Sequence, residues 1–332
     1  MRVALVGASR IAARTLPAWR AIPDVSVAGF CSRNAAFASD FSSQHEIAFL
    51  GTPESASLEG VDAVYISSVN SLHVQDVKSF LDRGMHVLVE KPFAMSHSDA
   101  LACFSLARSK GVHLQEGMMH RLHPELQVFG AALRDGRIGT LKEIDLNFGF
   151  VLETHGRARR TVAGGGGAVA DLGCYLIDFL TWQFGRWDWS HLRVDPEWEI
   201  DFNGERLDSN VQISFVMNQS VRVRLWCSIS IPSRNLWEAR GTGGAITLDR
   251  HDPQSWRNFS VDWINEESER VSLPIEKSGT EPSGSSLFLF ERQFRNFVQA
   301  CGRAAEPLVS ESDSVQNARV LECFLAEISA QR

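Results

Sequence analysis

Apolar residues in the first part of the chain form short uninterrupted runs, and stretches with helical spacing lie between these runs. Such runs are typical of strands buried on both faces of a parallel sheet, with the intervening helices as crossover connections. Residues 1–120 are therefore predicted to form an α/β domain with a doubly wound parallel sheet. The predicted strands cover residues 2–7, 25–31, 47–51, 61–67, 86–90 and 113–117, and the predicted helices cover 11–21, 34–44, 71–83 and 97–110.

After about residue 140 the apolar positions alternate strictly, which predicts strands with one face on a core. Asn203-Gly204 and residues 218–220 supply hairpin turns, and helical spacing returns over 168–182, 287–301 and 315–328. Residues 121–332 are therefore predicted to form an α+β domain with a large, open, mainly antiparallel sheet backed by helices. The alternating residues are Ile144, Leu146, Phe148, Phe150 and Leu152, then Val211, Ile213, Phe215 and Met217, then Val221, Val223, Leu225, Cys227 and Ile229.

The opposite face of these strands mixes charged, polar and aromatic residues, at Asn147, Arg222, Arg224, Trp226 and Ser228. Such a face either contacts water or pairs with the same face of another subunit. Because Arg and Trp are enriched where protein surfaces pair, we favour the second interpretation. The sequence thus predicts a homodimer or homotetramer that assembles through the open sheet face.

The composition argues against several classes of partner. The 332 residues carry a net charge of −7 without a long run of one sign, which argues against nucleic acid. No apolar stretch approaches the ~18 residues of a membrane span, and the apolar N-terminus reaches Ser9 and Arg10 too early for a secretory signal. The six cysteines are scattered without a CxxC pair, so we expect reduced thiols in a cytoplasmic protein.

The segment "GASRIA" follows the first predicted strand and opens the first predicted helix. Gly7 permits a tight turn, Ser9 is small enough for the backbone to approach a pyrophosphate, and Ala12 allows close packing of helix on strand. The helix N-terminus at Arg10 and Ile11 favours a phosphate charge. This pattern predicts a dinucleotide site, and a tight turn without a ligand is the alternative.

The end of the second predicted strand bears on the choice of cofactor. Sheets that bind NAD usually place an acid there to bond the ribose, but no acid lies between Gly29 and Phe37. Ser32 and Arg33 occupy that position, and an arginine beside a hydroxyl suits a 2′-phosphate. Arg10 adds further positive charge. NADP is therefore predicted over NAD, and an ordinary solvated charge is the alternative role for Arg33.

Glu90, Lys91 and Pro92 directly follow an apolar strand. Ligands of parallel sheets bind outside the carboxyl ends of the strands, so Lys91 is predicted to point into the nicotinamide crevice. The alternative is a surface ion pair that ends the strand. The Lys91–Pro92 bond is also a candidate for a cis peptide.

A second group of candidate residues follows a run of glycines at 164–167. Helical spacing places Asp171 and Tyr175 on one face, with Asp178 one turn further. A tyrosine beside a lysine suits proton transfer to an alcohol or ketone oxygen, and a neighbouring aspartate can orient either group. A packing role for Tyr175, with a bonded hydroxyl, has equal weight on spacing alone.

Two further groups of residues are weaker candidates. His120, His123 and His155 lack the additional carboxylates or cysteines that a metal site needs, so no metal is predicted. A basic run that precedes the glycines comprises Arg157, Arg159 and Arg160. We interpret these residues mainly as solvated charges. One of them is expected to reach the substrate, and Arg160 is the candidate.

Several motifs together resemble those of the glucose–fructose oxidoreductase / inositol dehydrogenase / MocA family (Gfo/Idh/MocA), in the order in which that family carries them. With Tyr175 at the end of D-x-G-x-Y, the sequence looks closest to the branch of NADP-dependent sugar dehydrogenases and dihydrodiol dehydrogenases. The segments are "GASRIA", "SSVNSLH", "GMHVLVEKPFAMS", "MMHRLHP", "GRIGTLKEI" and "GGGAVADLGCYLID", and "GTGGAITLD" matches mainly in pattern.

The resemblance implies an N-terminal Rossmann domain and a C-terminal domain whose open sheet pairs subunits. It implies that Lys91 bonds the reacting oxygen near the nicotinamide, that Tyr175 is the acid/base, and that Asp171 supports them. Either Lys91 or Tyr175 can carry the proton, so the division of roles stays open. The cofactor is further expected to contact Ser67, Asn70, His73 and Glu90, and Arg121 is expected at the domain junction near the substrate.

The predicted activity is therefore hydride transfer between a nicotinamide cofactor and a carbinol or carbonyl carbon of a sugar, polyol or diol-like substrate. Two alternatives remain. One is a non-catalytic NADP-binding regulator or sensor on the same fold, and the other is an enzyme that cleaves glycosides by oxidation and elimination.

Overall fold

The computed structural model describes residues 1–153, 157–232, 236–250, 259–275 and 287–332. It divides into two compact units, which are taken here one at a time. The first comprises Met1–Met119 and Leu287–Arg319, and the second comprises His120–Ser286 and Val320–Arg332.

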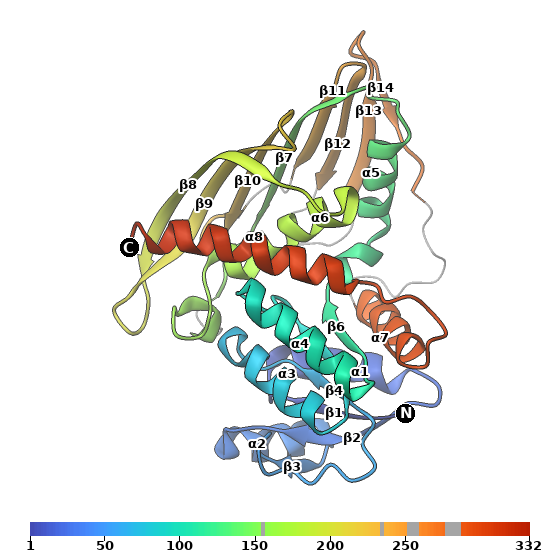
Figure 1. Ribbon diagram of the computed structural model, residues 1–332, viewed down its shortest axis with the longest axis vertical. Helices are drawn as coiled ribbons and strands as arrows, with labels where there is room; N and C mark the ends of the chain where they lie inside the picture. The colour runs from blue at the N-terminus through green and yellow to red at the C-terminus, as the bar shows by residue number, and fades with distance from the viewer. Residues whose placement is uncertain (154–156, 233–235, 251–258, 276–286) are drawn as a thin grey trace. The chain divides into compact units, whose positions relative to one another are not determined.

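The first unit contains a six-stranded parallel sheet in the order β3-β2-β1-β4-β5-β6, which confirms the predicted doubly wound sheet (Figure 1). Its strands are β1 (Arg2–Val6), β2 (Ser26–Cys31), β3 (Phe49–Gly51), β4 (Ala63–Ile66), β5 (His86–Glu90) and β6 (Leu114–Gly117). Its first helices are α1 (Arg10–Arg20), α2 (Ala35–His45), η1 (Asn70–Leu72), α3 (His73–Asp82) and α4 (His97–Lys110).

Both faces of this sheet are covered, which explains its uninterrupted apolar strands. Val64 and Ile66 of β4 pack with Val77 and Phe80 of α3 in one core cluster. Tyr65, between them in the sequence, faces the other side and is fully buried against aromatic rings. Alternate residues of a strand point to opposite faces, so both sets must be apolar.

The predicted helix ends agree with the observed caps. Ser9 and Asn34 each accept a bond from a backbone amide in the first turn of α1 and α2. Gly111 ends α4 in the left-handed conformation, with φ of 68°.

Helix α7 (Leu287–Cys301) and the first part of α8 (Glu311–Ser329) belong to the first unit. This differs from the predicted division, which assigned all of residues 121–332 to the second domain. The reason is aromatic packing, because the ring of Trp19 on α1 stacks on Phe294 of α7 at 4.0 Å between centroids. The spacing of apolar residues predicted α7 as a helix but carried no information about its partner.

The second unit contains an eight-stranded sheet in the order β14-β13-β12-β11-β7-β10-β9-β8, in which only the β7–β10 pair is parallel. The mainly antiparallel sheet was predicted, and Asn218 and Gln219 form the β9–β10 turn with positive φ angles. Strands β8, β11, β12, β13 and β14 were not predicted. The strands are β7 (Leu141–Gly149), β8 (Trp189–Ile200), β9 (Arg206–Met217), β10 (Val221–Ser228), β11 (Trp237–Gly241), β12 (Gly244–Arg250), β13 (Phe259–Ile264) and β14 (Arg270–Ser272).

Helices back one face of this sheet (Figure 1). They are α5 (Pro124–Arg134), α6 (Cys174–Phe184) and the last part of α8. Short helical turns cover Met119–Leu122 (η2), Arg157–Arg160 (η3) and Val169–Gly173 (η4), and η4 is a π-helical turn. Helix α5 was not predicted, although Pro124 at its first position is a helix-start signal.

The opposite face of the sheet carries pairs of opposite charge. Arg222 pairs with Glu143 at 2.6 Å and Arg224 pairs with Asp145 at 2.9 Å, and both arginines are exposed. Ser228 differs from its prediction as part of this exposed face, because it is buried and its Oγ donates to the carbonyl of Ser209.

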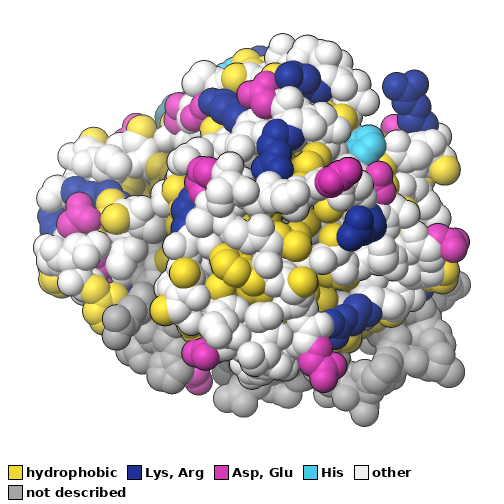
Figure 2. All heavy atoms as spheres, turned by 90° about the horizontal axis from the view of Figure 1, so that it is seen from below, with side chains coloured by type: hydrophobic (Ala, Val, Ile, Leu, Met, Phe, Trp, Pro, Cys, Tyr) yellow, Lys and Arg dark blue, Asp and Glu magenta, His cyan; other side chains and the backbone are white. Residues whose placement is uncertain are grey.

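Three findings concern the helices, the thiols and the surface charges. Among the residues that the structure describes, no helix is long and apolar enough to cross a membrane. All six cysteines are free thiols, and four of them are buried. Basic and acidic side chains are interspersed on the face drawn in Figure 2.

Candidate functional site

The loop between β1 and α1 has the geometry that the dinucleotide pattern predicts. Gly7 has φ of +102°, and a Cβ added there would lie 3.0 Å from the backbone of Ser67. Ser9 caps α1 through its Oγ, which accepts from the amide of Ala12 at 3.1 Å and donates to Ser67 Oγ at 3.0 Å. Arg10 and Ile11 form the first turn of α1, where backbone amides lack helical acceptors. This loop can therefore hold a phosphate.

The loop after β4 contains the next predicted residues. Ser67 is buried and contacts the carbonyl of Val6, so it links the ends of two adjacent strands. Asn70 is half-buried at the start of η1. Both residues lie at the carboxyl end of the parallel sheet, the edge at which such sheets bind ligands.

His73 lies behind this loop rather than on its exposed surface. It is fully buried, and its Nδ1 and Nε2 lie 2.9 Å and 3.0 Å from the carbonyl oxygens of Pro92 and Ser68. Burial lowers the pKa of the ring, although the backbone carbonyls oppose this shift. The ring thus joins the loop after β4 to the loop after β5, and both of its nitrogens are engaged inside the protein.

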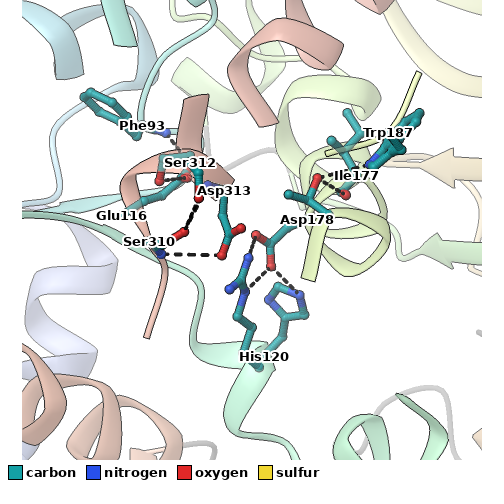
Figure 3. A network of polar contacts seen from close by, with 12 residues as sticks. Phe93, Glu116, His120, Ile177, Asp178, Trp187, Ser310, Ser312 and Asp313 are labelled. Carbon is teal, nitrogen blue, oxygen red and sulfur yellow. Dashed lines mark hydrogen bonds and ion pairs between the residues drawn. The ribbon is translucent and has the colours of Figure 1, made fainter. Parts of the chain in front are cut away.

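Lys91 follows the last residue of β5, and the backbone on both sides of it is held. Tyr65 donates its hydroxyl to Glu90 Oε1 at 2.6 Å. The amide of Phe93 donates to Glu116 Oε1 at 2.9 Å (Figure 3). The bond from His73 to Pro92 lies between these two contacts.

Two further features belong to the loop that contains Lys91 and to the side chains that hold it. The Lys91–Pro92 peptide is cis, as the sequence suggested. Ser314 of α8 also donates to Glu116, at 2.9 Å. Three buried side chains from three elements therefore fix the loop that presents Lys91, and they are Tyr65, His73 and Glu116.

Ser32 and Arg33 lie at the end of β2, as predicted. Ser32 is buried, and its Oγ accepts from the amide of Asn34 at 3.2 Å. Arg33 forms ion pairs with Asp76 at 2.5 Å and Glu54 at 2.6 Å. These bonds, first that with Asp76, raise the pKa of the guanidinium. Arg33 is therefore a positioned charge rather than a solvated one.

In the second unit, Tyr175 lies on the first turn of α6 and contacts two rings edge-on. The centroids of His120 and Phe148 are 5.1 Å and 5.6 Å from that of Tyr175. The predicted helix over 168–182 is present, but it begins with the π-helical turn η4, on which Asp171 lies. A π turn adds a residue to the helical repeat and changes the predicted spacing between Asp171 and Tyr175.

Asp171 is buried and paired with an arginine from the basic run. Arg159 Nε lies 3.0 Å from each carboxylate oxygen of Asp171, and an Nη atom of Arg159 contacts Oδ2 as well. The guanidinium of Arg159 also lies over the ring of Phe150, 5.7 Å from its centroid. Asp171 therefore has a cation partner that spacing did not identify.

Arg160 and Arg121, both predicted to contact substrate, differ in their surroundings. Arg160 pairs with Glu199 at 2.8 Å and lines a small recess. Arg121 is 3% exposed, and its Nε and Nη2 donate to the two oxygens of Asp178 at 2.9 Å and 2.7 Å. The guanidinium of Arg121 therefore belongs to a buried ion pair, and its contact with the substrate stays a prediction.

His120 completes this buried cluster, and its Nε2 lies 3.1 Å from Asp178 Oδ2 (Figure 3). Burial acts to raise the pKa of Asp178, but Arg121 and His120 hold it below its usual range. Burial lowers the pKa of His120. The described residues contain no group that could hold a metal ion, and His155 lies outside them.

Comparisons with known proteins identify the family. A protein-family model described as an oxidoreductase family with an NAD-binding Rossmann fold matches residues 1–118. A second family model, for the Gfo/Idh/MocA C-terminal domain, matches residues 127–247. The chain belongs to the Gfo/Idh/MocA oxidoreductase family. This confirms the predicted resemblance and the assignment as an enzyme.

Relatives of this Gfo/Idh/MocA oxidoreductase align over nearly its whole length. A trans-1,2-dihydrobenzene-1,2-diol dehydrogenase from Xenopus tropicalis is 31% identical over 96% of the chain and 93% of the relative. A dTDP-3,4-didehydro-2,6-dideoxy-α-D-glucose 3-reductase from Actinomadura kijaniata is 26% identical over 97% and 94%.

Solved structures share the fold. A 3-ketoreductase from Actinomadura kijaniata, in complex with NADP and TDP-benzene, has a TM-score of 0.82 and 24% identity, with 98% of this chain and 97% of that chain covered. An aldose–aldose oxidoreductase from Caulobacter crescentus, in complex with glycerol, has a TM-score of 0.80 and 19% identity, with 100% and 98% covered.

Sequence reasoning missed four side chains that hold the candidate residues of this Gfo/Idh/MocA oxidoreductase in place. They are Tyr65, Asp76, Glu116 and Arg159. A signal existed for Glu116, because an acid at the end of an apolar strand needs a partner. For the others, the partner lies at least twelve residues away in the sequence, and periodicity does not report such contacts.

Proposed function

We propose that this Gfo/Idh/MocA oxidoreductase transfers a hydride between NADP(H) and a carbinol or carbonyl carbon of a sugar, polyol or diol-like substrate. The observation that carries the proposal is the position of Lys91, at the carboxyl end of β5 in a loop fixed by buried contacts on both sides. The named activities of the relatives, on a keto sugar and on a cyclic diol, support this class of substrate.

The residues of the first unit fit a dinucleotide. The close approach of Gly7 to the backbone of Ser67 leaves no room for a side chain, and the first turn of α1 offers backbone amides to a pyrophosphate. We assign Arg33, with Ser32 and Arg10, to the 2′-phosphate. A bound nicotinamide supplies the hydride donor or acceptor, and every other role falls to the protein.

Lys91 is assigned to the reacting oxygen, where its ammonium group stabilises the developing negative charge. Tyr175 is assigned the proton transfer to or from that oxygen, as general acid or base. Asp171 supports this chemistry through its pair with Arg159, because the pair fixes the position of the carboxylate one turn before Tyr175.

Two further parts of the proposal concern the state of the protein in the cell. We assign the exposed charge pairs of Arg222 and Arg224 to a subunit interface between open sheet faces, which gives a homodimer or homotetramer. A cytoplasmic location is consistent with the free thiols of the chain.

The proposal is tested by following the change in NADPH absorbance with each member of a panel of keto sugars, aldoses, polyols and trans-diols. The Kd values for NADP and NAD are measured as well. We expect turnover of at least one panel member and tighter binding of NADP. Tight NADPH binding without turnover of any member would favour a non-catalytic regulator. A 3-keto intermediate released from a glycoside would favour oxidation followed by elimination.

A further inference from the structure

The guanidinium of Arg33 contacts two carboxylates of very different exposure. Asp76 of α3 is completely buried, and its Oδ1 and Oδ2 lie 2.5 Å and 3.4 Å from Nη2 and Nη1. Glu54 follows β3, in the turn between Thr52 and Ser55, and its side chain is 53% exposed. The side chain of Arg33 is itself 31% exposed. One partner therefore lies inside the protein and the other at its surface.

The buried partner fixes the position of the guanidinium. Asp76 Oδ2 also accepts a bond from Ser68 Oγ at 2.7 Å, so its carboxylate is held from two sides. A buried carboxylate that lost its cation would be left uncompensated at high cost, which keeps Arg33 on Asp76. Asp76 is thus a positioning residue for Arg33.

The exposed partner occupies the other edge of the guanidinium. Glu54 Oε1 lies 2.6 Å from both Nε and Nη2 of Arg33. This edge, with two parallel N–H groups, is one by which arginine binds phosphate in a bidentate manner. A 2′-phosphate and the Glu54 carboxylate are both anions, and they cannot share it.

We propose that Glu54 is a specificity-determining residue, which occupies the phosphate-binding edge of Arg33 until a 2′-phosphate displaces it. The inference rests on the proposed role of Arg33 in NADP binding. Displacement is feasible because exposed ion pairs stabilise proteins little. Glu54 therefore weakens NADP binding and leaves NAD binding unchanged, so it narrows the preference between the two cofactors.

The test is the variant Glu54→Gln, which keeps the length and polarity of the side chain and removes its charge. The Kd for NADP, measured by titration calorimetry, should fall about two- to fivefold, the range set by an exposed ion pair. The Kd for NAD should not change. Glu59→Gln is the matched control, because Glu59 is an exposed acid nearby in the sequence whose side chain does not contact Arg33 in the described structure.

Arg33→Gln separates failure of this inference from failure of the proposed NADP site. If Arg33→Gln leaves the ratio of the NADP and NAD Kd values unchanged, the assignment of Arg33 itself is wrong. If Arg33→Gln lowers the preference for NADP but Glu54→Gln does not raise it, the inference about Glu54 alone is overturned.

A double variant completes the test. The effect of Glu54→Gln on NADP binding should vanish in the Arg33→Gln background, because Glu54 acts through that guanidinium. A change of the ratio that comes entirely from weaker NAD binding would also overturn the inference, since it would make Glu54 a ribose ligand. Thermal unfolding confirms that each variant is folded.

Discussion

The two tyrosines of the chain offer a matched pair of substitutions with opposite expected results. Tyr65 is fully buried, with its ring between Trp19 and Phe294 and its hydroxyl 2.6 Å from Glu90 Oε1. Tyr175 is the proposed acid/base. Tyr→Phe removes only the hydroxyl at either site, so the two variants compare a structural hydroxyl with a chemical one.

The loss of stability expected for Tyr65→Phe follows from the hydrogen bond between the Tyr65 hydroxyl and Glu90. A hydrogen bond to a charged group contributes about 1.5–3 kcal/mol, and water reaches the half-buried Glu90 to replace part of it. We therefore expect Tyr65→Phe to lower the free energy of unfolding by about 1–2 kcal/mol, or Tm by about 2–8 °C. The kcat should fall by less than about tenfold, because His73 and Glu116 still hold the loop at Lys91.

Tyr175→Phe should show the reverse pattern. Loss of an acid/base lowers kcat by about 10²–10⁴-fold, whereas Tm should change little. Differential scanning calorimetry and NADPH-linked turnover of the best panel substrate measure both quantities. A Tyr65→Phe variant with unchanged Tm would refute the structural role of that hydroxyl, and a Tyr175→Phe variant with unchanged kcat would remove Tyr175 from the mechanism.

Two further predictions concern pH and assembly. Burial raises the pKa of Asp208 to about 6, above the value of about 3.9 for an unfolded aspartate, so its contribution to stability is largest below pH 4 and is lost as pH rises through 6. The free energy of unfolding of Asp208→Asn, measured with urea relative to the wild type, should therefore rise by on the order of 2 kcal/mol between pH 4 and 7. A difference between the two proteins that is independent of pH would contradict this. Replacing both Arg222 and Arg224 by Glu places like charges beside Glu143 and Asp145 and should convert the proposed oligomer to monomer in sedimentation velocity; an unchanged sedimentation coefficient would locate the interface elsewhere.

The first unit was the more predictable because its signals are local. Uninterrupted apolar runs give β4 and β5, and Ser9 and Gly111 mark helix ends through short-range bonds. The carboxyl end of β5 locates Lys91 at the ligand-binding edge of a parallel sheet.

What could not be predicted depends on contacts between distant segments. Arg33 and Asp76 are 43 residues apart, and nothing in the local pattern of either indicates that they pair. Helix α7 joins the first unit through Phe294. The spacing of its apolar residues predicts a helix but would be the same whichever core the helix packed against. Arg121 was assigned to the substrate from the family resemblance, and only the fold reveals its ion pair with Asp178.

The central claim is that Lys91 acts at the reacting oxygen of an NADP-dependent hydride transfer. Its most direct test is Lys91→Met, assayed for NADPH turnover with the best panel substrate and for NADPH binding by fluorescence. The account predicts that kcat falls by about 10²–10³-fold or more, as for the loss of a group that stabilises an oxyanion, whereas NADPH still binds. An unchanged kcat in a variant that binds NADPH normally would contradict it.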